Sequence, residues 1–324
     1  MVPGRLFDEA MSTGETAMSV VQSLKETVLG QMDNGSQHPE FVQSISQLDP
    51  NKNPLERTWR GNKKGTVRYQ GYPDFKNDKY AERQWVKEHL AGAFQYWGKI
   101  GFGEGLSGHI TVRDPVLEDH YWMNPFGMHF SCITVSDLVL VTPDGYASNH
   151  GAQLPINQAG FNIHSAIHRA RPEIKAACHC HSLYGKAWSV FGKKVDILTQ
   201  DACLFFNNQG VYENFGGIVL SAEEGKQIAE ALGPKFKTCI LQNHGLLTLG
   251  ETVDEATYLF SALDRMCKAQ LLVEAAASKG LQKRVIGEEE AAFTAATLQY
   301  PENVYANFQA EYGLLVKERG HIFL

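Results

Sequence analysis

The stretch that decides the fold is Cys178-His179-Cys180-His181, read together with Gln242-Asn243-His244-Gly245 further along the chain. The run from Ile174 to Cys180 is typical of a strand, in which alternate side chains point to opposite faces. We therefore expect the imidazoles of His179 and His181 to project from one face and the two neighbouring thiols from the other.

A third imidazole follows the next predicted strand. His244 lies in the turn after the apolar run 238–242, and Gly245 behind it allows the chain to turn sharply. Three imidazoles from two strand ends would hold one face of a metal ion and leave the opposite positions open. Open positions are typical of a catalytic site, so we predict His179, His181 and His244 as ligands of a catalytic metal.

The composition is typical of a globular protein and limits the kinds of partner that the chain can bind. With 324 residues, of which 43% are hydrophobic and 20% charged, the chain has enough apolar residues for a sizeable core in one or two domains. The formal charge of −6 and the absence of a dense Lys/Arg run argue against nucleic acid and membrane surfaces as partners. The six cysteines form no C-x-x-C pair, and neither a signal-peptide core nor a run of about 18 apolar residues occurs. We therefore expect reduced thiols and a cytoplasmic protein.

The spacing of apolar and helix-breaking residues predicts three parts. Residues 1–78 would form a helix (7–32) followed by a polar linker or surface wrap, residues 79–280 the metal-binding domain, and residues 281–324 an extension that packs on this domain or on a neighbouring subunit. Within the domain we predict helices at 79–101, 157–171, 182–188, 223–232 and 252–280, and strands at 109–113, 121–124, 138–141, 174–180, 238–242 and 246–249.

The strands cluster without regular alternation with helices, which favours an α/β fold with a mostly antiparallel sheet covered by helices on both faces. The chain contains neither G-x-G-x-x-G after a strand nor a P-loop, so we predict no nucleotide cofactor.

Other histidines and the cysteines have competing interpretations. His164 and His168 have a metal-binding i, i+4 spacing, but Ser165 replaces the glutamate of H-E-x-x-H, so we interpret them as buried hydrogen-bonding residues near the site. His109 fits an active-site donor and a satisfied turn residue equally well. A nucleophilic cysteine is the weakest hypothesis, because Cys178 and Cys180 should point away from the imidazoles.

Five motifs occur in an order that resembles the class II aldolase/adducin family over about residues 79–280. They are S-G-H-I-T-V-R (107–113), N-P-F-G (124–127), Arg171-Pro172, H-C-H (179–181) and Q-N-H-G-L-L (242–247). The resemblance implies an αβα sandwich around a mixed, mainly antiparallel central sheet with helices on both faces. It also implies three imidazoles on a divalent metal, and a homo-oligomer, commonly a tetramer with sites at subunit interfaces.

Departures from the sugar-phosphate aldolases change the chemistry that the resemblance implies. The family's acid/base glutamate falls on Gly160, or near Gln158 if the loop shifts, and neither residue is a carboxylate. The phosphate-binding positions fall on Phe126, on Gln158-Ala159 and on His109. A phenylalanine cannot hydrogen-bond a phosphate, so a phosphorylated substrate is disfavoured.

Two other branches of the family share this altered pattern. One is adducin, a cytoskeletal interaction protein. The other is a group of non-heme iron oxygenases of specialised metabolism that oxidatively decarboxylate 2-hydroxy acids. The stretch 198–206, together with W-M-N-P-F-G (122–127), is most similar to the second branch.

The resemblance therefore implies an O2-dependent oxidative decarboxylase. Fe(II) on His179, His181 and His244 would bind a small 2-hydroxy acid through its hydroxyl and carboxylate and leave a position for O2. No 2-oxoglutarate would be needed, because the substrate supplies the electrons. By position alone, His109, Gln158 and Tyr184 are the candidates for orienting the substrate or passing protons.

Two alternatives remain. Three imidazoles accept Zn(II) at least as readily as Fe(II), so a zinc-dependent aldolase or decarboxylase acting on a non-phosphorylated substrate fits the same ligands. The other alternative, from a different class, is an adducin-like interaction domain with a vestigial site.

Overall fold

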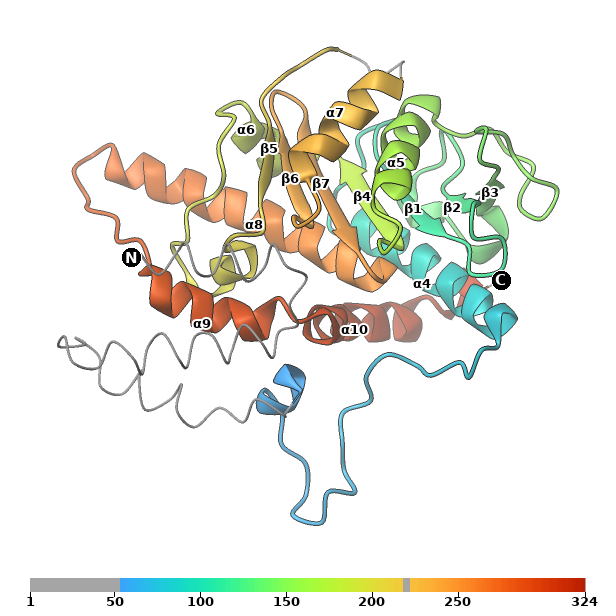
Figure 1. The fold of residues 1–324 in the computed structure, drawn as a ribbon, viewed down its shortest axis with the longest axis horizontal. Helices are drawn as coiled ribbons and strands as arrows, with labels where there is room; N and C mark the ends of the chain where they lie inside the picture. The colour runs from blue at the N-terminus through green and yellow to red at the C-terminus, as the bar shows by residue number, and fades with distance from the viewer. Residues whose placement is uncertain (1–52, 218–221, 324) are drawn as a thin grey trace.

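The computed structural model describes residues 53–217 and 222–323, so the helix predicted for residues 7–32 lies outside the described residues. A seven-stranded sheet with the strand order β3-β2-β1-β4-β7-β6-β5 forms the centre of the described chain (Figure 1). Its strands are β1 (His109–Arg113), β2 (Tyr121–Met123), β3 (Val139–Val141), β4 (Ala176–Cys180), β5 (Gly210–Tyr212), β6 (Thr238–Leu241) and β7 (Gly245–Gly250).

The pairing of the strands confirms a mixed, mainly antiparallel sheet. Every neighbouring pair is antiparallel except β5 and β6, which are parallel. In the pairing of β1 with β4, His109 lies directly opposite His179. The sequence did not predict β5, because a strand of three residues is too short to show an alternation of apolar and polar side chains.

Helices cover both faces of the sheet, as the sequence predicted. Helices α5 (Gln158–Ala170) and α7 (Ala222–Leu232) lie side by side over one face (Figure 1). Helices α4 (Lys79–Lys99), α6 (Leu183–Ser189) and α8 (Val253–Ala277) cover the other face.

The alternation along β4 decides which side chains meet each helical layer. Cys178 and Cys180 belong to the core beneath α4 and α8, whereas Ala177 packs in a second core beneath α5 and α7. His179 shares the face of Ala177, because the two are separated by two positions on one strand. The prediction that the thiols and the imidazoles face opposite ways is confirmed.

Side-chain caps set the starts of three long helices. Asp78 accepts hydrogen bonds from the backbone N–H groups of Tyr80 and Ala81 at the start of α4. Asn157 caps α5, and Thr252 caps α8 by accepting the backbone N–H of Glu255. These short polar residues satisfy N–H groups that have no partner inside a helix. The predicted starts at 79, 157 and 252 therefore agree with the structure within one residue.

Two C-terminal helices complete the layer that contains α4 and α8. They are α9 (Glu288–Leu298) and α10 (Pro301–Glu318), and α10 packs on both α4 and α8. From α10, Val304, Phe308 and Leu315 are buried in the core of that layer. The sequence predicted residues 281–324 as an extension that packs on the domain or on a neighbouring subunit, with no secondary structure specified. The short 3-10 turns are η2 (Pro54–Arg57), η3 (Phe130–Cys132), η4 (Val135–Asp137), η5 (Gln200–Phe205) and η6 (Gly320–Phe323).

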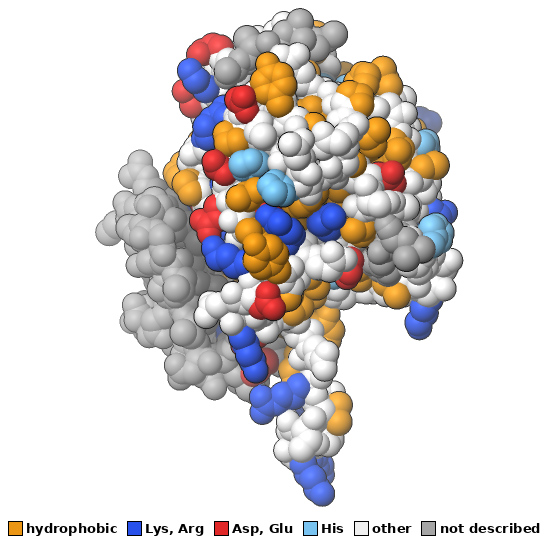
Figure 2. Space-filling model, turned by 90° about the vertical axis from the view of Figure 1, so that its right-hand side faces the viewer, with side chains coloured by type: hydrophobic (Ala, Val, Ile, Leu, Met, Phe, Trp, Pro, Cys, Tyr) orange, Lys and Arg blue, Asp and Glu red, His pale blue; other side chains and the backbone are white. Residues whose placement is uncertain are grey.

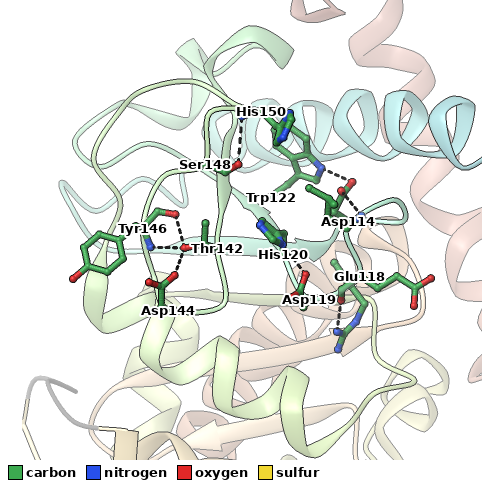
Figure 3. Close-up of polar contacts among 12 residues, drawn as sticks. Asp114, Glu118, Asp119, His120, Trp122, Thr142, Asp144, Tyr146, Ser148 and His150 are labelled. Carbon is green, nitrogen blue, oxygen red and sulfur yellow. Dashed lines mark hydrogen bonds and ion pairs between the residues drawn. The ribbon is translucent and has the colours of Figure 1, made fainter.

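The outer part of the sheet is held by a polar network around Asp114 (Figure 3). The carboxylate of Asp114 is fully buried, accepts the indole N–H of Trp122 at 3.1 Å and pairs with the guanidinium of Arg83 on α4. After β3, the hydroxyl of Thr142 accepts the backbone N–H of Tyr146 at 3.1 Å and closes a turn. These contacts join α4 to the end of β1 and stabilise the edge of the sheet.

Residues 58–71 form an extended loop that projects away from the helices (Figures 1 and 2). This loop contains four basic residues and no acidic residue: Arg60, Lys63, Lys64 and Arg68. Within residues 53–217 and 222–323, no helix is long and apolar enough to cross a membrane.

Candidate metal centre

Three imidazoles meet where β4 ends and β7 begins. The potential ligand atoms of His179, His181 and His244 all lie within 4.8 Å of one another. The ring centroids are 5.2 Å apart for His179 and His181, 4.7 Å for His179 and His244, and 4.9 Å for His181 and His244. The structure therefore brings together the three residues that the sequence predicted as metal ligands.

A tight turn between β6 and β7 delivers His244 to this cluster. The backbone N–H of His244 donates to the carbonyl of Leu241 at 3.0 Å, and Asn243 adopts a positive φ of 57°. A Cβ on Gly245 would lie 3.0 Å from the carbonyl oxygen of Cys180 and 3.7 Å from the rings of both His179 and His181. Glycine at 245 thus allows β7 to start close beside the imidazoles.

The orientation of the His179 ring is fixed by a backbone acceptor. His179 Nδ1 lies 2.8 Å from the carbonyl oxygen of Leu246, and a carbonyl can only accept a hydrogen bond. Nδ1 therefore carries the proton, and Nε2 of the neutral ring keeps its lone pair. A hydrogen bond of this kind from the second ring nitrogen is typical of histidines that bind metals.

Burial keeps the three rings in the form that binds a metal. Desolvation is the largest cause that lowers the pKa of His179 well below 6.5, and it lowers the pKa of His244 to about 4. The pKa of His181 is also lowered by desolvation, then by the nearby ammonium of Lys186, while Glu104 opposes the shift. Neutral imidazoles at neutral pH are ligands for both zinc and iron, so the donor set fits a divalent transition metal.

His109 lies beside the cluster. Its ring is 3% exposed, and its centroid is 5.2 Å from that of His179 and 4.3 Å from that of His164 on α5. A Cβ added at Gly160 would lie 2.5 Å from His109 Nδ1 and at a similar distance from two ring carbons, so Gly160 packs flat against this ring. The position at which related aldolases are expected to carry a glutamate is here the contact surface of a histidine.

The other two predicted site residues lie further out. Gln158 is the exposed first residue of α5, two residues before Gly160. Tyr184 on α6 is half-buried, and the ammonium of Lys268 lies 4.8 Å from the centroid of its ring. Within the described ranges, His109 makes ring contact with the imidazole cluster, whereas Gln158 and Tyr184 do not.

Several polar residues near the cluster were not singled out from the sequence. Thr111 on β1 binds both His164 and His168 through its hydroxyl, which confirms the interpretation of these two histidines as buried hydrogen-bonding residues. Asn124 of the N-P-F-G motif donates to the carbonyl of Gly108 at 3.4 Å, and its own amide oxygen is buried without a partner in the described chain. Thr111 had a sequence signal, because it lies two residues after His109 and hence on the same face of the strand.

A separate cavity lies at the other end of the sheet and does not include the imidazoles. It has a volume of about 490 Å³ and is lined, among others, by Arg113, Lys175 and Thr252. These residues end β1, precede β4 and cap α8, respectively, whereas the imidazoles lie at the opposite ends of the same strands. The cavity is therefore distinct from the candidate metal centre.

Comparison with known proteins places this geometry in a family. Residues 88–271 match the family model described as "Class II Aldolase and Adducin N-terminal domain". The chain belongs to the class II aldolase/adducin family. Class II aldolases depend on a metal, which accords with the three converging imidazoles of this member.

Individual members of the class II aldolase/adducin family with enzyme names are similar to this chain. Decarboxylase NovR of Streptomyces niveus is 46% identical over 201 residues, which are 61% of this chain and 74% of that protein. The 4-hydroxy-3-prenylphenylpyruvate oxygenase/4-hydroxy-3-prenylbenzoate synthase of Streptomyces roseochromogenus subsp. oscitans is 45% identical over 201 residues, 61% of this chain and 72% of that protein.

A solved structure supports the fold. The structure described as L-fuculose 1-phosphate aldolase from Glaciozyma antarctica PI12 is 41% identical, superposes with a TM-score of 0.70, and covers 78% of this chain and 96% of its own. The chain thus has the class II aldolase fold, and its similarity to named decarboxylase, oxygenase and synthase proteins identifies it as an enzyme.

Proposed function

We propose that this class II aldolase-fold enzyme catalyses the O2-dependent oxidative decarboxylation of a small 2-hydroxy acid, with Fe(II) held by His179, His181 and His244. The observation that carries the proposal is an intact cluster of three neutral imidazoles in a chain 46% and 45% identical to a named decarboxylase and a named oxygenase. No nucleotide and no 2-oxoglutarate takes part in the proposed reaction.

The proposed reaction balances without a further co-substrate. A 2-hydroxy acid R-CH(OH)-COOH and one O2 give the shorter acid R-COOH, one CO2 and one water. Oxidation of the hydroxyl-bearing carbon to a carboxyl carbon and release of the old carboxyl group as CO2 supply all four electrons that O2 takes up. Bound Fe(II) would supply the one-electron chemistry that lets O2 react with a closed-shell organic acid.

The neutral charge of the three imidazole ligands supports an anionic substrate that chelates the metal. Three neutral ligands leave a bound divalent metal with its full positive charge, which favours a carboxylate with a neighbouring hydroxyl. We propose that His109, whose ring lies beside that of His179, hydrogen-bonds such a hydroxyl. Phe126, in the position that would contact a phosphate in a sugar-phosphate aldolase, is 43% exposed and offers an apolar surface instead.

Tyr184 and Gln158 are the other two residues that we propose to contact the substrate. Both lie at helix starts: Gln158 opens α5, and Tyr184 is the second residue of α6 and follows His181 by three residues. We propose that they contact the distal part of the substrate and do not share the role of His109. Similarly, the family resemblance supports a homotetramer, which would have four times the 36.0 kDa mass of one chain.

A second candidate function is a zinc-dependent aldolase or decarboxylase acting on a non-phosphorylated substrate. The observation that favours it is the 41% identity to a structure described as an aldolase. The same three imidazoles would hold Zn(II). In this case His109, whose ring lies beside that of His179, would exchange a proton with the substrate.

One experiment separates the two candidates. The full chain is purified without oxygen, added metal or chelator, its metal content is measured, and O2 uptake is followed with aryl-substituted and alkyl-substituted 2-hydroxy acids. The oxygenase is supported by bound iron, one O2 consumed per CO2 released and an acid product one carbon shorter. Bound zinc with C–C cleavage that continues without O2 would support the lyase. An iron-loaded protein that consumes no O2 with any acid of the panel would contradict the primary proposal.

A further inference from the structure

A chain of buried hydrogen bonds starts beside His109 and runs along the α5 face of the sheet. The hydroxyl of Thr111 lies 2.8 Å from His164 Nδ1 and 2.9 Å from His168 Nε2. His168 Nδ1 lies 3.3 Å from the carbonyl oxygen of Ile174. The three side chains are at most 1% exposed, so no bulk water competes for these contacts.

In this series of hydrogen bonds, the donor and the acceptor of each contact can be assigned. The Ile174 carbonyl can only accept, so His168 Nδ1 donates to it. Desolvation lowers the pKa of His168 to about 3, which leaves the ring neutral and its Nε2 an acceptor. The single hydroxyl proton of Thr111 therefore points to His168 Nε2.

The same reasoning continues to His164. Because the proton of Thr111 is already used, the Thr111 oxygen must accept the remaining contact, and His164 Nδ1 donates to it. Burial also holds the pKa of His164 well below 6.5, so this ring is neutral. His164 Nε2 consequently has a lone pair and no proton.

Next to His109, this series of hydrogen bonds begins with unsatisfied ring nitrogens on both His109 and His164. His164 Nε2 is buried without a partner in the described chain, and so are both ring nitrogens of His109. The two ring centroids are 4.3 Å apart. A neutral His109 has one N–H and one lone pair, and leaving either buried without a partner is unfavourable. His164 Nε2 is thus a buried acceptor without a partner, on the ring that lies beside His109.

We infer that Thr111, His164 and His168 are positioning residues that fix the tautomer of His109. His164 Nε2 accepts the N–H of His109, and the second nitrogen of His109 faces the imidazole cluster as a hydrogen-bond acceptor for the hydroxyl of the bound acid. All donors in the chain then point in one direction, from His109 towards Ile174. The inference rests on the proposed function only for the identity of the hydroxyl that His109 accepts.

The tautomers can be read directly by nuclear magnetic resonance. The full chain is labelled with 15N-histidine, loaded with diamagnetic Zn(II), and its ring nitrogens are assigned by single substitutions. We expect a protonated Nδ1 and an unprotonated Nε2 for both His164 and His168. A protonated Nε2 on His164 in the wild-type protein would overturn the inference.

Two substitutions of Thr111 test the coupling to His109. Thr111→Val keeps the shape of the side chain and removes the hydroxyl, whereas Thr111→Ser keeps the hydroxyl. We expect Thr111→Val to change the tautomer signals of both His164 and His109, and Thr111→Ser to restore them. In the oxygen-dependent reaction, Thr111→Val should lower kcat about tenfold with little change in KM, because an interaction with the reacting hydroxyl is weakened, and Thr111→Ser should recover most of it.

The failures of the two proposals are distinguishable. If His109 responds to Thr111→Val in the spectra but no 2-hydroxy acid is turned over, the tautomer inference stands and the proposed function fails. If the acid is turned over but the His109 signals are the same in wild type and Thr111→Val, the tautomer inference is wrong. A Thr111→Val variant that does not fold leaves the wild-type spectrum of His164 as the deciding measurement.

Discussion

His109 lies directly opposite His179 where β1 pairs with β4, and the centroids of their rings are 5.2 Å apart. His179 belongs to the imidazole cluster and donates to the backbone carbonyl of Leu246. Both ring nitrogens of His109 are buried, and His164 Nε2 is the partner that we infer for one of them. Residues directly opposite each other in an antiparallel pair share a face, so the pairing register itself sets His109 against the candidate metal centre.

Because His109 lies beside the proposed metal ligands but is not one of them, its substitution should lower activity without loss of the metal. His109→Gln should keep the metal, because His179, His181 and His244 remain. Its kcat should fall roughly 10- to 100-fold, which corresponds to the loss of a buried hydrogen bond worth about 1–3 kcal/mol. Metal analysis and steady-state kinetics check this, and loss of the metal from His109→Gln would contradict the assignment of His109 outside the ligand set.

Removal of one cluster member should remove the metal itself. His244→Ala leaves two imidazoles, and we expect its metal content to fall from about one ion per chain to a small fraction, since loss of a ligand weakens binding far more than tenfold. His150→Ala is the matched control, because His150 is an exposed histidine in the loop between β3 and α5 (Figure 3). Equal metal contents in the two variants would refute the ligand assignment.

Gly160 is predicted to be intolerant of any side chain. In Gly160→Ala the new Cβ would lie 2.5 Å from His109 Nδ1, so the ring must move, at a cost of about 1–3 kcal/mol in the free energy of unfolding together with a loss of activity. Gly313→Ala is the control, because Gly313 is also helical and a Cβ there meets nothing within 4 Å. The control should be stabilised by about 0.5–1 kcal/mol. Chemical denaturation measures both, and two stabilised variants would show that the space at Gly160 is not restricted.

Because His168 is buried and neutral, we predict that the free energy of unfolding falls in acid. Its pKa is about 3 in the folded protein, against 6.5 in a solvated chain, so below pH 6.5 the unfolded state binds a proton that the native state does not. The free energy of unfolding should therefore fall as pH drops from about 6.5, by up to about 1.4 kcal/mol per pH unit from this residue. His168→Gln lacks this contribution and should have a shallower slope between pH 6.5 and 5. Denaturant titrations of the metal-free proteins at several pH values compare the slopes, and identical slopes would contradict the prediction.

The thiols should divide into one reactive and five inert groups. Cys132 is exposed, and the other five cysteines are buried. Desolvation raises the pKa of Cys178 and of Cys180, so neither forms the reactive thiolate at neutral pH. A thiol reagent should modify one group per native chain, and Cys132→Ser should abolish that reaction. Rapid modification of two or more thiols in the native wild type would show that a buried cysteine is accessible.

The sequence by itself determined the members of the imidazole cluster and the character of the fold. A strand has a side-chain period of two, so the spacing of His179 and His181 placed both on one face, and the capping residues Asn157 and Thr252 marked the starts of two helices. The ordered motifs were specific enough to indicate the family that the comparison then established. These signals are local, and local signals can be read from the chain alone.

Tertiary structure decided what surrounds those imidazoles. The short strand β5 gave no clear sequence pattern, because three residues are too few to show alternation. The helices α9 and α10 were not predicted, although the spacing of Val304, Phe308 and Leu315 on α10 is helical. His109 fitted two roles equally in the sequence, and only the register of β1 with β4, together with the close approach of Gly160, placed its ring against His179. The hydrogen bonds from Thr111 to His164 and His168 cross from a strand to a helix some 50 residues later. Contacts of that range depend on how the layers pack, which no local periodicity encodes.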